Sequence, residues 1–216
     1  MTDRDAATEP ARHAPPRRLD LLVRPTGEVT VKGARTRRVF LRTLRSNVRD
    51  ACNRAGLRAE VRTLHNRLRV RVAIPSGEEV EPGAGPSPEA AMRRTTREVL
   101  QRVFGVGSFS FVEATCPPDL DAIVAMSVRH AATRVRGRRY AVRCRRAGRH
   151  GFRSTDVERA VGSALNDGAT VDLTDPEVTV RLQVDDRRAL LHGEPHAGPG
   201  GLPVGSGGRA LVLASG

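Results

Sequence analysis

Aromatic residues are scarce in this chain: its 216 positions include no Trp, one Tyr and five Phe. Hydrophobic residues nevertheless make up 38% of the sequence, which is enough to fill modest cores. We therefore expect the cores to be packed mainly by Val, Leu and Ala. The length allows two small domains or one larger domain.

Close cysteine pairs and long apolar runs are also missing. Cys52, Cys116 and Cys144 lie far apart in the sequence and form no Cys-x-x-Cys motif, so we expect no zinc motif and no disulfide framework. No apolar run approaches the roughly 18 residues of a membrane-spanning helix. The N-terminus lacks the apolar core of a secretory signal. These absences predict a cytoplasmic protein with no membrane partner.

Lysine is nearly absent, because Lys32 is the single Lys and the other basic residues are Arg. Lys plus Arg total 37 against 24 acidic residues, giving a net charge of +13. A GC-rich genome would favour Arg over Lys, but it would not create this excess over acidic residues. The excess favours nucleic acid as the partner, over an anionic membrane surface or a merely basic surface.

Hydrophobic periodicity predicts an α+β protein of two domains. Residues 1–17 are polar and rich in charge and Pro, and we expect them to form a disordered tail. Residues 18–115 then show the order βαββαβ, typical of a ferredoxin-like domain. The expected elements are a strand at 19–23, a helix at 34–55, a hairpin at 58–64 and 68–73, a helix at 88–103 and a strand at 108–114.

The sequence Cys116-Pro117-Pro118 marks the boundary of a second domain at 116–195. A capping box from Thr155 to Glu158 is expected to begin its second helix. Residues 196–216 are expected to form a Gly/Pro-rich linker followed by an unpaired strand at 210–213. The second domain is expected to contain helices at 119–135 and 156–166 and strands at 139–145, 178–184 and 189–192.

The segment RCRRAGRHGFRSTDVERAVG (143–162) is the strongest candidate binding site. It places basic residues at a strand end, in a turn and at a helix N-terminus, where free N–H groups and the helix dipole favour a phosphate. Phe152 could stack on an unpaired base or belong to the core. The predicted RNA contacts here are Arg139, Arg143, Arg145, Arg146, Arg149, His150, Phe152 and Arg153.

Two further basic surfaces are expected to assist. The helix at 34–55 presents a face rich in Arg, and Lys32, Arg38 and Arg42 are its predicted RNA contacts. In the strand at 68–73, Leu68, Val70 and Val72 alternate with arginines that face the other side. The arginines of that strand are Arg67, Arg69 and Arg71.

The remaining motifs predict no catalytic or metal-binding residue. His192 and His196 are four residues apart, but Gly193 and Pro195 argue against the helix that would align them on a metal. Asp185-Asp186 is expected to form a hairpin turn rather than a catalytic carboxylate pair. Ser154 is expected to cap a helix rather than to act as a nucleophile.

Several segments resemble the THUMP domain of the tRNA 4-thiouridine sulfurtransferases, the ThiI family. They are the basic strand, the Ala147-Gly148-Arg149-His150 turn (Arg-Gly-Arg/Lys-His in the family) with Ser154-Thr155-Asp156-Val157-Glu158-Arg159 after it, the segment 173–180, the Val184-Asp185-Asp186 turn and the segment 198–205. The segment 28–33, followed by an Arg-rich helix, is similar to the N-terminal ferredoxin-like domain of that family. The resemblance covers residues 19–216.

This resemblance implies a tRNA-binding region that recognises the acceptor end and measures the distance to the modified uridine. In that family a PP-loop domain binds the phosphates of ATP through the motif Ser-Gly-Gly-x-Asp-Ser. Only Ser215 and Gly216 of this motif are present here. We therefore expect this chain to bind no cofactor and to have no catalytic residue, ATP belonging to the missing domain.

Three functions remain open from the sequence. The chain could serve a separate PP-loop subunit or be a split or truncated sulfurtransferase. It could be an autonomous module that serves a different RNA-modification enzyme, or a non-catalytic relic that binds nucleic acid non-specifically. The family makes a homodimer and a link to thiamine synthesis plausible, and the sequence does not identify the preferred tRNA.

Overall fold

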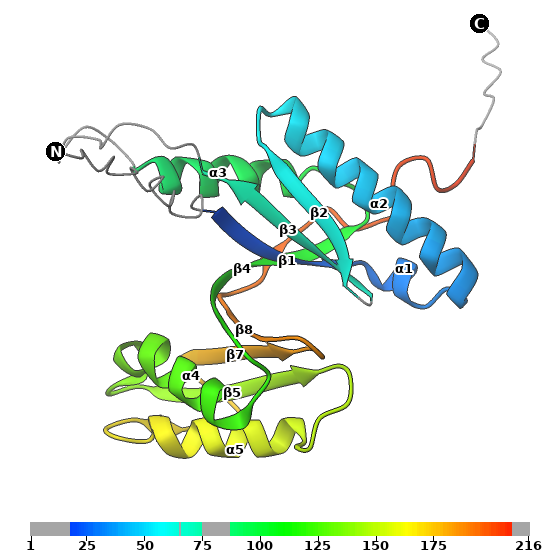
Figure 1. Cartoon of the computed structure of the whole chain (residues 1–216). Helices are drawn as coiled ribbons and strands as arrows, with labels where there is room; N and C mark the ends of the chain where they lie inside the picture. The colour runs from blue at the N-terminus through cyan, green and yellow to red at the C-terminus, as the bar shows by residue number, and fades with distance from the viewer. Residues whose placement is uncertain (1–17, 65, 75–86, 209–216) are drawn as a thin grey trace, which may run out of the picture.

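The computed structural model describes residues 18–64, 66–74 and 87–208, which form two α/β modules (Figure 1). The N-terminal tail at 1–17, most of the acidic loop at 75–88 and the strand expected at 210–213 lie outside the described residues. Among the described helices, none has the length and apolar character needed to cross a membrane.

The first module has the predicted ferredoxin-like order. Its antiparallel sheet runs β2-β3-β1-β4, and α2 and α3 pack on one face of it (Figure 1). A four-residue helix, α1 (Gly27–Thr30), precedes α2 and was not predicted. The elements are β1 (Arg18–Pro25), α2 (Ala34–Arg54), β2 (Ala59–Leu64), β3 (Arg67–Ala73), α3 (Pro88–Leu100) and β4 (Val106–Cys116).

The two faces of this sheet differ in chemistry, as the alternation in β3 predicts. Leu68, Val70 and Val72 are fully buried in the core beneath α2 and α3. The intervening arginines of β3 therefore lie on the opposite, open face. This open face faces the second module (Figure 1).

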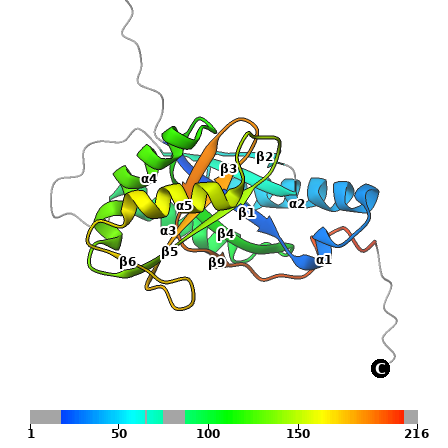
Figure 2. The same ribbon diagram turned by 90° about the horizontal axis from the view of Figure 1, so that it is seen from below.

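The second module continues the same sheet in the order β4-β8-β7-β5-β6. Its helices α4 and α5 lie side by side on the face away from the first module (Figure 2). Tyr140, fully buried in this core, donates its hydroxyl hydrogen bond to the carbonyl oxygen of Gly162 at 2.6 Å. The elements are α4 (Leu120–Val135), β5 (Arg139–Arg146), α5 (Ser154–Leu165), β6 (Thr170–Val171), β7 (Val178–Val184) and β8 (Ala189–His192).

The strand β4 belongs to both modules. Its residues 106–111 pair with β1, and its residues 112–116 pair with β8. A register shift between Val112 and Ala114 interrupts the second ladder, and such irregularities bend a strand. The predicted boundary at Cys116 is thus the end of a shared strand, and the open faces of the two sheets face each other (Figure 1).

The Gly/Pro-rich segment after β8 is held against the first module, although it was expected to be a linker. A short strand, β9 (His196–Ala197), pairs with Ser108 and Phe109 of β4. Further along, the N–H of Gly200 donates to the carbonyl of Val106 at 2.9 Å, and the N–H of Gly105 donates to the carbonyl of Gly200 at 2.7 Å. The chain therefore returns to the ferredoxin-like module before residue 208.

The predicted capping box at α5 was wrong, because the helix begins earlier than expected. Arg153 occupies the N-cap position, and its N–H donates to the carboxylate of Asp156 at 2.7 Å. The carboxylate of Glu158 instead accepts the N–H of Cys144 in β5 at 2.7 Å. Glu158 thereby joins the helix to the strand rather than closing the helix end.

The buried ion pair between Arg69 and Asp20 yields a stability prediction. Arg69, which is 7% exposed, donates hydrogen bonds to both carboxylate oxygens of Asp20. The substitution Asp20→Ala leaves the guanidinium buried without its partner and should lower the free energy of unfolding by about 3 kcal/mol. Asp50→Ala removes an exposed pair with Arg49 and should cost no more than about 1 kcal/mol. Urea denaturation measures both, and equal losses would contradict the prediction.

Candidate nucleic-acid interface

A cavity of about 480 Å³ lies between the open faces of the two sheets. Strand β1, the β2–β3 hairpin, β5, the β5–α5 loop, β7 and β8 all contribute to its wall, so neither module forms it alone. Its lining residues are Leu22, Leu64, Asn66, Arg67, Cys144, Arg145, Arg146, Ala147, Ser154, Gln183, Asp185 and Leu190.

Arginines from different elements are crowded around this cavity. Arg67 donates a hydrogen bond to the side-chain oxygen of Gln183 across the gap between the modules. Burial, with the nearby charges of Arg24 and Arg145, lowers the pKa of Arg67 to about 10. Burial, followed by Arg145 and Arg181, also lowers the pKa of Arg24. These groups stay protonated at neutral pH, and their mutual repulsion would be relieved by a bound anion.

Few acidic groups balance these charges. Arg181 forms an ion pair with Glu194, whereas Arg24, Arg67 and Arg145 form no ion pair with another described residue. The carboxylate of Asp185 is occupied by the backbone N–H groups of Arg187 and Arg188 at 2.9 and 3.1 Å. The cavity is therefore a cationic site.

The cavity contains a cysteine, but not in a reactive state. Burial raises the pKa of the Cys144 thiol to about 11, and Glu158 adds to this effect. The thiol is protonated at neutral pH, and the nucleophilic form of cysteine is the thiolate. Cys144 thus contributes packing to the wall of the cavity.

The position of Phe152 in the β5–α5 loop distinguishes between its two expected roles. The rings of His150 and Phe152 stack with centroids 5.3 Å apart and an interplanar angle of 24°. Phe152 is half-buried and packs against the core of the second module. One face of Phe152 is covered by His150, so the arrangement favours the core role over stacking on a base.

The basic face of α2 borders a second hollow of about 440 Å³ beside the hairpin. Asn66, at the hairpin tip, lines both this hollow and the cavity between the sheets. The two basic surfaces therefore meet at the hairpin. The hollow is lined by Ala34, Arg37, Arg38, Leu41, Arg42, Arg45, Thr63 and Asn66.

Some predicted contacts are not brought to this site. Arg139 lies at the opposite end of β5 from Arg146, about 23 Å away for seven residues of extended strand. Its Nη1 atom lies 3.3 Å from Asp172 and 3.0 Å from Asp175, and its Nε atom lies 3.5 Å from Glu177. Its charge is thus satisfied within the protein.

Arg143, Lys32, Arg69 and Arg71 do not line the cavity either, whereas Arg67 of β3 does. Arg143 is exposed on the open face, but it donates to the carbonyl of Leu173 at 2.6 Å. Arg69 and Arg71 both lie against Asp20. Lys32 is exposed between α1 and α2 and lines neither hollow.

Two family models match the two modules separately. The model of the ThiI ferredoxin-like domain matches residues 20–83, and the model of the THUMP domain matches residues 118–192. This chain is a ThiI ferredoxin-like domain followed by a THUMP domain. The fold class expected from the sequence is therefore confirmed.

Curated relatives carry the name tRNA sulfurtransferase. The chain is 36% identical to that of Marinobacter nauticus over 201 residues, which are 92% of this chain and 39% of the relative. It is 34% identical to that of Desulfurococcus amylolyticus over 197 residues, which are 90% of this chain and 37% of the relative. The chain thus spans about two fifths of the length of the curated relatives that it matches.

Solved structures share the fold. PH1313 from Pyrococcus horikoshii superposes with a TM-score of 0.68 at 23% identity, covering 88% of this chain and 58% of that one. A 4-thiouridine synthetase, crystallised with RNA and ATP, superposes with a TM-score of 0.60 at 19% identity, covering 92% of this chain and 47% of that one. These likenesses concern the arrangement of the two domains.

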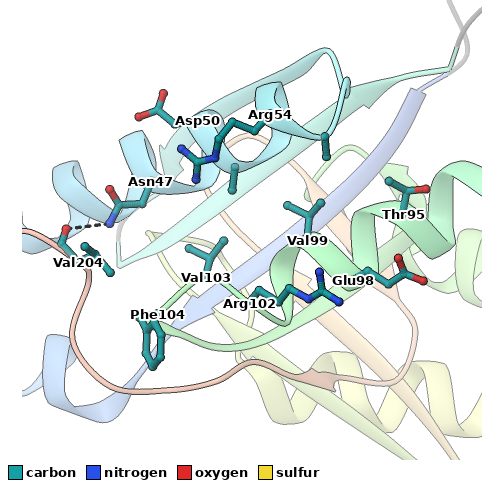
Figure 3. A pocket seen from close by; sticks show the side chains of 12 residues that line it. Asn47, Asp50, Arg54, Thr95, Glu98, Val99, Arg102, Val103, Phe104 and Val204 are labelled. Atoms are coloured by element: carbon teal, nitrogen blue, oxygen red, sulfur yellow. Dashed lines mark hydrogen bonds between the residues drawn. The ribbon is translucent and has the colours of Figure 1, made fainter.

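A larger cavity, of about 570 Å³, lies on the outer side of the ThiI ferredoxin-like domain between α2 and α3 (Figure 3). Its polar wall is balanced in charge, with Asp50 and Glu98 alongside Arg54 and Arg102. At one end Asn47 donates to the carbonyl of Val204 at 3.0 Å (Figure 3). Because it lacks a cationic excess, it is the weaker candidate for a polyanion despite its size.

The residues that sequence reasoning missed lie where the two domains meet. Arg24 and Gln183 belong to different domains, and their sequence neighbourhoods contain no motif. The alternation of β1 and β7 could have placed each on an open sheet face. Only the packing of the THUMP sheet opposite the ThiI ferredoxin-like sheet brings Arg24 close to Arg145 and Arg181, beside the cavity that Gln183 lines.

His192 of β8 yields a pH prediction. It is 3% exposed, and burial lowers its pKa to about 4, with Arg24, Arg181 and Arg67 adding to the shift. His192 is neutral in the folded state, while the unfolded chain takes up a proton below a pH of about 6.5. The contribution of His192 to the free energy of unfolding, roughly 2–3 kcal/mol, is therefore present at pH 7 and lost as the pH falls from about 6.5 to 4.

Urea denaturation at pH 7 and at pH 4.5 checks this expectation. The loss of stability between the two pH values should be smaller in His192→Gln than in the wild type. The comparison uses this difference, because carboxylates that titrate in the same range affect both proteins alike. An identical loss in the two proteins would show that His192 is already protonated or exposed.

Proposed function

We propose that this chain binds tRNA in the cavity between its ThiI ferredoxin-like and THUMP domains, and presents it to a PP-loop domain for 4-thiouridine formation. The observation that carries the proposal is the cluster of Arg24, Arg67, Arg145 and Arg146 at the junction of the two domains. The curated relatives that contain this pair of domains are named tRNA sulfurtransferases.

The size of the cavity supports a single-stranded segment as its occupant. A volume of about 480 Å³ is that of a small-ligand pocket, so a duplex would remain outside. The Arg-rich face of α2, which meets the cavity at Asn66, offers phosphate contacts to an adjoining duplex. This division suits a tRNA acceptor end, in which a single strand follows a stem.

The arginines would act by charge rather than by reading bases. Guanidinium groups pair with phosphates in a bidentate geometry, and such contacts fix register and orientation. The N-terminus of α5 at Ser154, which also lines the cavity, adds free N–H groups and a positive dipole. The chain would therefore position tRNA without selecting its sequence.

We assign ATP binding and sulfur transfer to the PP-loop domain, in the same polypeptide or in a separate subunit. A homodimer stays an expectation. The alternative, a module that serves a different RNA-modification enzyme, has less support, because the match to the ThiI ferredoxin-like domain accompanies the THUMP match.

Two arginines of β5 provide a matched test of this proposal. Arg145→Gln removes a cation from the cavity and should weaken the binding of labelled tRNA about 5- to 10-fold in fluorescence anisotropy. The slope of log Kd against log salt concentration should fall by about 0.7–0.9, which corresponds to one lost phosphate contact. Arg139→Gln, at the other end of the strand, should leave tRNA affinity within about twofold of wild type, since its charge is held by Asp172 and Asp175. If both variants bind like the wild type, the cavity is not the tRNA site.

A further inference from the structure

We propose that Asp186, an acidic residue beside the basic cavity, is a positioning residue that strengthens tRNA binding. It lies in the β7–β8 turn and holds the β5–α5 loop, which follows Arg146 and carries Arg149 and His150. This inference rests on the proposed tRNA site and assigns a role to an aspartate that the Asp-Asp turn alone does not require.

The contact between Asp186 and the loop is close and specific. Its Oδ1 atom accepts the backbone N–H of Arg149 at 3.1 Å. A Cβ atom placed on Gly148 would lie 1.8 Å from that oxygen and 2.4 Å from the carboxyl carbon. Gly148 also has a φ of +92°, a conformation that favours glycine. The carboxylate therefore occupies the space above Gly148, and a side chain at this position would have to displace it.

The loop has a second anchor on the same side. The N–H of Ala147 donates to the carbonyl of Val184, the last residue of β7, at 2.9 Å. From the end of β5, Nη1 of Arg146 donates to the carbonyl of Gly148 in the loop at 3.0 Å. The bond to Val184 fixes the start of the loop, and the bond to Asp186 fixes the backbone of Arg149. Without Asp186 the second half of the loop loses this anchor.

The neighbouring aspartate has a different task. Asp185 accepts the backbone N–H groups of Arg187 and Arg188 and so closes the β7–β8 turn itself. Asp186 is exposed, and its Oδ1 atom bonds instead to a segment 37 positions away in the sequence. The turn can therefore form without Asp186, whereas the loop conformation uses it.

Positioning and simple electrostatics predict opposite results. A carboxylate beside phosphate-binding arginines repels a polyanion, so by charge alone its removal should tighten tRNA binding. If Asp186 positions the loop, its removal should weaken binding, because the arginines lose their orientation. The sign of the change in affinity separates the two effects.

The experiment compares Asp186→Ala with Asp186→Asn in the full chain, using tRNA anisotropy. Asp186→Ala should raise Kd about 2- to 10-fold, the range expected for one lost hydrogen bond. It should also reduce the salt slope by about 0.7–0.9 if one phosphate contact is lost with the loop. Asp186→Asn keeps an oxygen acceptor and removes the charge, so it should bind tRNA at least as tightly as the wild type. Circular dichroism and the thermal midpoint show that each variant is folded.

A double-mutant cycle with Arg149→Ala tests whether Asp186 acts through that residue. The effects of Asp186→Ala and Arg149→Ala on tRNA affinity should be less than additive, because each substitution removes the contact between the Arg149 side chain and tRNA. Tighter or unchanged binding by Asp186→Ala overturns the positioning role. If Arg145→Gln weakens tRNA binding in the same assay, such a result for Asp186→Ala contradicts only the role of Asp186 and leaves the tRNA site intact. If Arg145→Gln has no effect either, the tRNA site and the role of Asp186 fall together.

Discussion

Backbone hydrogen bonds along β4 join β1 of the ThiI ferredoxin-like domain to β8 of the THUMP domain. Because β4 pairs with strands of both domains, the domains are joined by a hydrogen-bonded strand and not by a flexible linker. The helices cover the outer faces, so the open sheet faces are turned toward each other. The basic cavity, the hydrogen bond from Arg67 to Gln183 and the contact between Asp186 and the β5–α5 loop all depend on this arrangement.

The arginines at the domain junction repel one another and are partly buried, and both effects destabilise the folded state unless packing elsewhere offsets them. Burial and like charges lower the pKa of Arg24 and Arg67, so both favour an anionic ligand over the empty cavity. The ion pairs elsewhere show the contrast: Asp20 neutralises Arg69, and Asp172, Asp175 and Glu177 surround Arg139. The protein thus uses some arginines to build the fold, while Arg24, Arg67 and Arg145 at the domain junction form no ion pair within the described part of the chain.

Much of the fold follows from local patterns in the sequence. The alternation of Leu68, Val70 and Val72 fixed one face of β3, and the strands at 178–184 and 189–192 occur as expected. The site was only partly predictable. The sequence predicted RNA contacts in the β5–α5 segment, but it predicted Arg139 as a contact equally with Arg145. The carboxylates that pair with Arg139 lie more than 30 positions away in the sequence, so no local pattern shows that its charge is already paired. The roles of Arg24, Gln183 and Asp186 depend on packing between domains, which no local pattern encodes.

The central claim is that tRNA binds between the two open sheet faces. Hydrogen exchange of the full chain, measured by mass spectrometry with and without tRNA, tests it most directly. The account predicts that tRNA slows exchange in the β2–β3 hairpin, in the β5–α5 loop at 147–153 and in the β7–β8 turn. Exchange around the outer cavity between α2 and α3 should be unchanged. Protection confined to the outer cavity, or to the loop at 172–177 around Arg139, would contradict the account.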